Sequence, residues 1–194
     1  MITFKSINTT RVVLAFSILW LVTACTLQVS TLSDKDIVPH LAELVNAVSS
    51  GSAEDLLALV QFSSLPCTKK EGLGGPPKCL ATETEGTRID VLPILGPEGG
   101  HIRRSEFSSW FGSLTGVGAP QLYAAFRTSK STYSDEFFPA GEFGVAFLLP
   151  DKANVVVFRV TDAGIVRVDY PALPSYEDIL KDNKVILGPY PPPK

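Results

Sequence analysis

The chain has 194 residues, 45% of them hydrophobic, and a formal net charge of −3 at pH 7. This length suffices for a single domain with a buried core. The negative charge argues against a nucleic-acid partner, because such a partner requires a basic face that displaces phosphate counterions.

The N-terminal segment has the pattern of a secretory signal peptide. Lys5 and Arg11 precede an apolar run from Val12 to Val22, and small residues follow it. The run is too short for a membrane-spanning helix, so we expect residues 1–24 to be cleaved off. The loss of two of the 17 basic residues and none of the 20 acidic ones gives the remaining chain a formal charge of −5.

The residues at this cleavage site, Val22-Thr23-Ala24-Cys25, resemble the lipobox of bacterial lipoproteins. In that class the cysteine is acylated, with chains such as palmitate, and becomes the first residue of the mature protein. The resemblance implies lipidation of Cys25 and an extracytoplasmic location on the bacterial cell membrane or envelope. Because the chain is acidic, it gains no attraction to anionic lipid headgroups, so multiple acyl chains are the expected membrane attachment.

The number of cysteines is odd, which in a secreted chain would normally mean an unpaired thiol. If Cys25 carries lipid, Cys67 and Cys79 remain to form a disulfide in an oxidising compartment. Such a bond would close a 13-residue loop (67–79) and stabilise the fold by about 3 kcal/mol. The alternatives are two free thiols or half of a metal site. The histidines, His40 and His101, show no spacing that suggests a shared site, so we expect no metal and no cofactor.

Residues 25–33 are expected to form a short polar tether, followed by a helical hairpin. One helical face carries apolar residues at helical spacing, namely Ile37, Leu41, Leu44, Val45 and Val48. Pro39 predicts the start of the regular helix, with the proline in its first turn. The segment Ser50-Gly51-Ser52 ends this helix, and Ser52 with Asp55 predicts the capped start of a second, shorter one.

The segment Ser63–Glu85 is expected to be a surface loop fastened by its own disulfide. Its glycine run is followed by Pro76 and Pro77 rather than by Gly-Lys-Ser/Thr, which argues against a phosphate-binding loop. Alternating residues then predict a strand over Thr87–Leu95, and Pro93 suggests that this strand lies at a sheet edge.

The last part of the chain is expected to be rich in strands. Ser105 first caps another short helix, which ends before Gly116. Strands are predicted over Gln121–Thr128, Phe143–Leu149, Val155–Thr161 and Ile165–Tyr170. The last three are joined by short connections, which cannot link parallel strands, so they predict an antiparallel meander. Ser175 with Asp178 predicts one more short helix, before a Pro-rich tail.

This order of elements is that of an α+β fold. Over about Asp34 to Tyr170 the chain resembles the NTF2-like (SnoaL-like, cystatin-like) superfamily, most clearly in the turn Asn46–Leu56, which is similar to the Gly-Asp-Ala-Xaa turn of that superfamily. The resemblance implies an NTF2-like cone over residues 34–174, in which an N-terminal helical hairpin packs on a curved, mainly antiparallel sheet. Residues 175–194 then form the C-terminal helix and tail. Ser52 stands where the usual aspartate does, and the loop between the cysteines is not a usual feature.

Enzymes of this superfamily use an aspartate or histidine in the mouth of the cone, often facing a tyrosine. Here the resemblance points to Asp90 or His101 with Tyr123, a set suited to proton abstraction beside a carbonyl. The same elements carry further polar residues, namely Arg127, Arg159, Arg167 and Asp169. Most of these positions alternate with apolar neighbours, which favours side chains that face water over a catalytic role. His101 follows a glycine turn, which favours a surface-loop histidine over a proton shuttle.

Phe137 and Phe138 are adjacent in a polar segment, Ser129–Gly141. Two neighbouring aromatic residues in such a segment cannot easily both point inward, so we expect one to cover the cone mouth or to contact a partner. Replacing both by serine is then expected to leave the stability nearly unchanged.

These observations favour a lipid-anchored extracytoplasmic protein that binds a partner protein or a small apolar ligand without catalysing a reaction. Because this fold hosts several kinds of function, two alternatives stay open. One is a small-molecule isomerase, cyclase or hydrolase that uses Asp90 or His101 with Tyr123. The other is a structural envelope subunit that forms a homodimer through the open face of its sheet.

Overall fold

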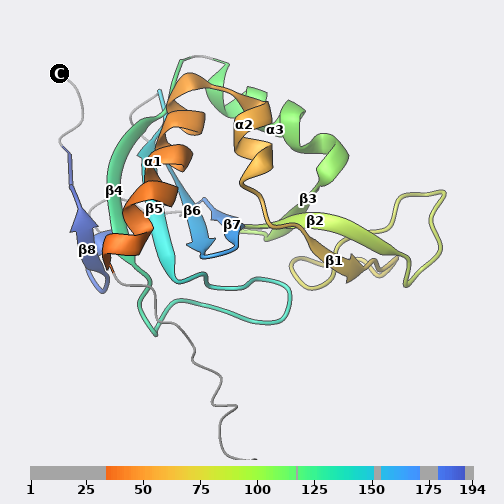
Figure 1. Cartoon of the computed structure of the whole chain (residues 1–194). Coiled ribbons are helices and arrows are strands. Elements are labelled where there is room, and N and C mark those ends of the chain that lie inside the picture. The colour runs from red at the N-terminus through yellow and green to blue at the C-terminus, as the bar shows by residue number, and fades with distance from the viewer. Residues whose placement is uncertain (1–33, 117, 151–153, 171–178, 191–194) are drawn as a thin grey trace, which may run out of the picture. The chain divides into compact units, whose positions relative to one another are not determined.

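The computed structural model describes residues 34–116, 118–150, 154–170 and 179–190 (Figure 1). All of them belong to one compact unit, Leu32–Lys194. The expected signal peptide and tether, the helix expected at Ser175–Asp178 and the end of the Pro-rich tail lie outside the described residues. The described part is an α+β fold, with N-terminal helices and a mixed, mostly antiparallel sheet that is not closed.

The predicted helical hairpin is confirmed in α1 (Asp34–Ser50) and α2 (Ala53–Ala58). Gly51 lies between them with a φ of 71°, a left-handed conformation that glycine adopts readily. Ser52 caps α2, because its hydroxyl accepts a hydrogen bond from the backbone N–H of Asp55 at 3.2 Å.

The start of α1 differs from the expectation. The helix begins at Asp34, ahead of Pro39, so Pro39 does not mark its first turn. A proline inside a helix costs one backbone hydrogen bond. The residues that follow it, Leu41 and Leu44, are buried in the core, and such tertiary packing supplies most of a helix's stability.

The third helix also begins differently. A short 3-10 turn, η2 (Arg104–Glu106), leads directly into α3 (Phe107–Thr115), so Ser105 is not its N-cap. The carboxylate of Glu106 instead accepts a hydrogen bond from the backbone N–H of Arg103 at 3.2 Å. This bond is the one that the N3 carboxylate of a capping box makes to the N-cap N–H, which differs from the N-cap bond expected of Ser105.

Within the described residues, eight strands form one sheet. They are β1 (Ser63–Pro66), β2 (Arg88–Leu95), β3 (Gly100–Arg103), β4 (Gln121–Arg127), β5 (Phe143–Leu148), β6 (Val155–Thr161), β7 (Gly164–Asp169) and β8 (Lys184–Leu187). Their order is β1-β2-β7-β6-β5-β4-β8, and β3 pairs with β2. The predicted antiparallel meander is confirmed in β5, β6 and β7. The pairing of β2 with β7 is parallel and short, at Ile94 and Leu95.

The strand β2 lies inside the sheet, so the edge position suggested by Pro93 is wrong. It pairs with β1, β3 and β7, and Pro93 itself lies opposite His101 of β3. Residues in an antiparallel pair alternate between hydrogen-bonded and non-hydrogen-bonded positions, so a strand can hold a proline inside a sheet. The strands β1, β3 and β8 are additional to the predicted ones, and β1 lies in the segment expected to be loop.

Buried side chains lie on both faces of the sheet. The helices cover one face (Figure 1), where aromatic rings fill the space between the layers, among them Phe107, Phe111, Phe143, Phe147 and Phe158. A second buried cluster includes Tyr123, Val155, Val157 and Ile179. Since neighbouring residues of β6 belong to different clusters, both faces of this strand are buried.

Gly144 on β5 allows the ring of Phe126 to lie directly against the strand. A Cβ at position 144 would come within 2.4 Å of two carbons of this ring, and Phe126 is fully buried. We expect Gly144→Ala to lower the free energy of unfolding by about 1–3 kcal/mol, because an overpacked core must shift. Urea unfolding followed by circular dichroism measures the change.

Gly112→Ala in α3 is the matched control. A Cβ there meets nothing within 4 Å, so we expect stability to stay the same or to rise by up to about 1 kcal/mol, owing to the higher helix propensity of alanine. Equal stability of Gly144→Ala and the unchanged protein would contradict the close packing of Phe126.

Candidate functional site

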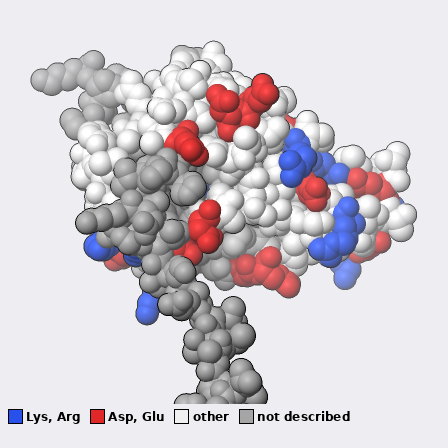
Figure 2. Space-filling model, in the orientation of Figure 1, with Lys and Arg blue, Asp and Glu red and all other residues white. Residues whose placement is uncertain are grey.

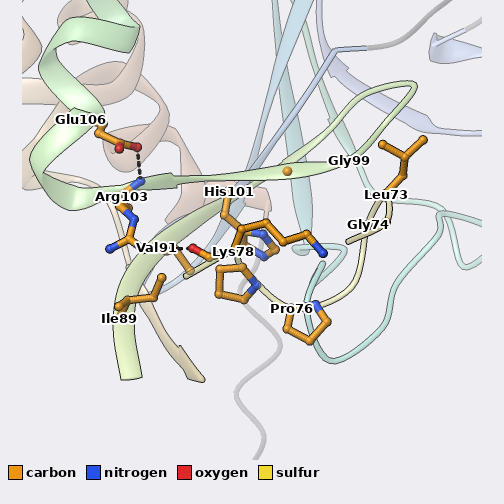
Figure 3. Close-up of a pocket in the computed structure, with 13 residues that line it drawn as sticks. Leu73, Gly74, Pro76, Lys78, Ile89, Val91, Gly99, His101, Arg103 and Glu106 are labelled. Atoms are coloured by element: carbon orange, nitrogen blue, oxygen red, sulfur yellow. Dashed lines mark hydrogen bonds between the residues drawn. The ribbon is translucent and has the colours of Figure 1, made fainter. Parts of the chain in front are cut away.

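A pocket of about 330 Å³ lies between the segment Gly72–Lys78 and the hairpin of β2 and β3. In Figure 2, Lys and Arg side chains gather mainly at this end of the domain, near β1 and β2. The walls combine apolar and polar side chains (Figure 3), including Leu73, Pro76, Lys78, Ile89, His101 and Arg103. The pocket therefore combines apolar side chains with the basic Lys78 and Arg103 and the acidic Glu106.

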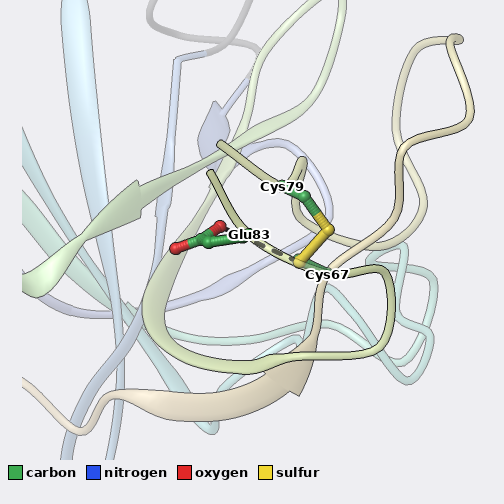
Figure 4. A group of neighbouring side chains, drawn as sticks. All are labelled: Cys67, Cys79 and Glu83. Atoms are coloured by element: carbon green, nitrogen blue, oxygen red, sulfur yellow. Dashed lines mark hydrogen bonds between the residues drawn. A yellow bond between two sulfur atoms is a disulfide. The ribbon is translucent and has the colours of Figure 1, made fainter. Parts of the chain in front are cut away.

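One wall of the pocket is the loop between the two cysteines, and the expected disulfide closes this loop. Cys67 and Cys79 are bonded, with Cα atoms 4.9 Å apart (Figure 4). Glu83 lies beside the bond, and the potential ligand atoms of the three residues all lie within 4.8 Å of one another. Since both sulfurs take part in the disulfide, neither is the thiolate that a metal ion binds. The two cysteines therefore act as a crosslink and not as metal ligands.

Arg103 of β3 bonds both to this loop, at Lys78, and to the segment that follows it, at Glu83. The guanidinium of Arg103 donates to both carboxylate oxygens of Glu83, each at 2.7 Å, and to the carbonyl of Lys78 at 3.0 Å. The hydrogen bond from Arg103 holds the pKa of the Glu83 carboxyl below its usual range, and that of Arg103 is raised in turn. The pocket wall is thus held by one covalent bond and one bidentate pair.

His101 is not the surface-loop histidine that the sequence favoured. It lies on β3, half-buried, with its ring centroid 5.2 Å from that of Phe138. Among the described side chains, its Nε2 is buried without a hydrogen-bond partner. Burial lowers the pKa of His101 to about 4, against the opposing effect of a backbone hydrogen bond with Phe137. The imidazole is therefore neutral at pH 7.

The three candidate catalytic residues do not form one constellation. Asp90 lies on β2 with an exposed side chain, 3.9 Å from Arg104. Tyr123 lies on β4, only 3% exposed, in the second buried cluster. Because β7, β6 and β5 lie between β2 and β4 in the sheet, Tyr123 does not face Asp90 or His101.

The other polar candidates behave differently from side chains that face water. Arg159, Arg167 and Asp169 are all buried and joined by ion pairs. Arg127 is half-buried, with its guanidinium carbon 4.6 Å from the centre of the Phe143 ring. The alternation of residue types along β6 and β7 could not reveal the burial of Arg159, Arg167 and Asp169, because segments distant in the sequence cover the second face of the sheet.

The two adjacent phenylalanines differ in burial. Phe138 is 2% exposed and belongs to the interior, whereas Phe137 is half-buried. The carboxylate of Asp135 accepts hydrogen bonds from both of their backbone N–H groups at 2.8 Å. Replacing both by serine would therefore remove a core side chain, contrary to the expectation of unchanged stability. A contact with a partner stays a prediction, with Phe137 as the residue that retains accessible surface.

Within the described residues, no helix combines the length and the apolar character needed to cross a membrane. Comparison of the chain with protein-family models and with curated protein sequences finds no match.

The buried imidazole of His101 predicts a pH dependence of stability. Its pKa falls from 6.5 to about 4 on folding, so the unfolded chain binds a proton that the folded domain excludes. The contribution is fully present above pH 6.5 and is lost as the pH falls toward 4. Between pH 7 and pH 5 we expect a loss on the order of 1 kcal/mol, allowing for screening by solvent.

His101→Phe is the comparison that isolates this effect, because it keeps a ring against Phe138 and removes the titrating group. Urea unfolding at both pH values is expected to show a smaller loss in this variant. Glu83 and Asp135, whose pKa values are also lowered, titrate in both proteins and cancel. Identical pH dependence of the two proteins would contradict the buried, neutral state of His101.

Removal of the crosslink tests its share of the stability. We expect the double variant Cys67→Ser, Cys79→Ser to lose about 3 kcal/mol of unfolding free energy, because the unfolded chain regains the entropy of an open loop. Thermal unfolding with and without reductant is the measurement. The reductant should destabilise the unchanged protein and leave the double variant unaffected. A sensitivity to reductant that persists in the double variant would refute the assignment.

Proposed function

We propose that this chain is an extracytoplasmic lipoprotein of the bacterial envelope, anchored by acyl chains on Cys25. The observation that carries the proposal is how the cysteines are used. Cys67 and Cys79 form a disulfide, which is typical of an oxidising compartment. The remaining cysteine is Cys25, at the end of the lipobox-like Val22-Thr23-Ala24-Cys25.

We propose further that the folded domain binds a small ligand without catalysing a reaction. The pocket beside the disulfide supports this, since Ile89 and Leu73 can contact an apolar body while Lys78 lies near a polar end. His101, with a pKa of about 4, is a weak base at neutral pH, where an effective general base has a pKa near the working pH. An isomerase, cyclase or hydrolase using Asp90 or His101 with Tyr123 therefore has less support.

The finer fold proposal is an NTF2-like cone. It is supported by the hairpin of α1 and α2 with its Ser52 cap and by the antiparallel strands β4 to β7. The parallel pairing of β2 with β7 and the crosslinked loop depart from the expected pattern.

A second candidate is a structural envelope subunit that dimerises or contacts a partner protein. Its specific support is the filled space between the helices and the sheet, where Phe107, Phe111 and Phe147 are fully buried. A domain whose interior is occupied by its own rings binds other molecules at its surface.

The anchor is tested by mass spectrometry of the protein extracted from membranes of its host. We expect an N-terminal peptide that begins at Cys25 and carries several acyl chains. Cys25→Ser should abolish both the lipid adduct and the membrane association, since one polar side chain cannot replace acyl chains. Recovery of an intact Met1 without lipid would refute the anchor and leave the pocket proposal untouched.

The ligand is tested by native mass spectrometry of the same detergent-extracted protein. We expect a bound small molecule that is lost in Ile89→Asp, because a carboxylate among the apolar side chains of the pocket is unfavourable. Leu187→Asp, a partly exposed residue on β8, is the matched control and should keep the ligand. Equal retention in both variants, or a preparation that carries no ligand at all, would refute binding at this pocket.

A further inference from the structure

Two arginines lie directly opposite each other in the sheet. The register of β6 and β7 pairs Arg159 with Arg167, and like charges in this position repel. Asp169, two residues after Arg167, lies between the guanidinium groups. Its Oδ1 accepts from Nε of Arg167 at 2.6 Å, and its Oδ2 accepts from Nε of Arg159 at 2.6 Å and from Nη2 of Arg167 at 3.1 Å.

The charges of this triad do not balance. Two guanidinium groups face one carboxylate, and the residues are only 8% (Arg159), 0% (Arg167) and 7% (Asp169) exposed. An arginine cannot lose its proton to escape burial. The exposed carboxylate of Asp135 also interacts electrostatically with Arg167 and offsets part of this charge. The triad itself still has one more guanidinium than carboxylate, and a positive charge largely removed from water is stabilised by a nearby anion.

The two arginines are not equally available for that group. Arg167 donates from Nη1 to the carbonyls of Tyr133 at 2.9 Å and Phe138 at 3.0 Å, besides its bonds to Asp169. Arg159 uses Nε for Asp169 and makes one long bond, 3.4 Å, from Nη1 to the hydroxyl of Thr128. In the part of the chain that the structure describes, no acceptor is bonded to its Nη2 amino group. The terminal fork of Arg159 is thus the available donor.

A pocket of about 270 Å³ lies at this fork. Its lining includes Arg159 and four hydroxyl-bearing residues of the segment after β4, Ser129, Ser131, Thr132 and Tyr133. The hydroxyl of Tyr133 donates to Asp135. One acidic side chain besides Asp169 lines it among the described residues, the exposed Asp182. The hydroxyls of Ser129 and Ser131 bond to each other at 2.8 Å, so one of these two, together with that of Thr132, is left as a donor that can complete the shell of an oxyanion held by the arginine.

We propose that this pocket binds a small organic carboxylate, held end-on by the Nη1 and Nη2 groups of Arg159. A planar carboxylate matches the two parallel N–H groups of a guanidinium fork. Asp169 positions Arg159 from the other side, because its bond to Nε fixes the plane of the guanidinium. The site is separate from the pocket beside the disulfide and needs neither that pocket nor the lipid anchor.

The test is calorimetric titration of the full-length protein, in non-ionic detergent, with potassium succinate against potassium chloride of equal ionic strength. We expect saturable binding of succinate. Arg159→Gln should weaken it about tenfold or more, because the charged donor is lost. Arg104→Gln, an exposed arginine elsewhere, is the matched control and should bind as the unchanged protein does.

Asp182→Asn keeps the test decisive if Arg159→Gln fails to fold, since Asp182 is exposed and its replacement spares the core. Loss of a negative charge from the pocket lining should tighten succinate binding by about two- to fivefold. Three results would overturn the proposal: no saturable succinate binding, an affinity that Asp182→Asn leaves unchanged, or binding of inorganic phosphate where succinate does not bind. The ligand test at Ile89 would be unaffected by any of them.

Discussion

A guanidinium group without exposed surface lies on the second face of the sheet, and the segment between β4 and β5 is arranged around it. Arg167 stays charged when buried, so its N–H groups must find acceptors inside the protein. The acceptors are the carboxylate of Asp169 and the carbonyls of Tyr133 and Phe138. Because these carbonyls belong to the segment 129–141, satisfying one buried cation constrains a stretch that has no regular secondary structure of its own.

The same segment reaches the pocket beside the disulfide. Phe138, whose carbonyl accepts from Arg167, places its ring against His101 on β3. Asp135 fixes the backbone at Phe137 and Phe138, because its carboxylate accepts hydrogen bonds from both of their N–H groups. The burial that keeps His101 neutral therefore depends in part on the conformation that Arg167 imposes. The two pockets are chemically distinct, yet a single irregular segment contributes to the surroundings of both.

The sequence predicts those features of this fold that depend on neighbouring residues. The helical hairpin follows from apolar spacing and from the Ser52 cap, and the meander follows from connections too short for parallel strands. Features set by distant contacts could not be read in this way. The strands β1 and β8 are short and gain their partners across the sheet, from β2 and β4. The edge position was predicted from the proline at position 93 alone. That residue carries no information about β3, which folds back and pairs with β2. Arg159 and Arg167 look like surface residues along their strands, and only the covering segment buries them.

The two candidate sites respond to burial in opposite ways, and this difference follows from side-chain chemistry. A histidine can relieve the cost of desolvation by releasing its proton, which is why His101 is a neutral group beside apolar side chains. An arginine has no such route, so the surplus charge at Arg159 persists until an anion neutralises it. The pocket beside His101 suits a molecule with an apolar body and a polar end near Lys78, whereas the pocket at the undercompensated guanidinium favours an acid. Neither proposed binding mode includes a proton transfer, so both rest on the charge and polarity of the groups that line the two pockets.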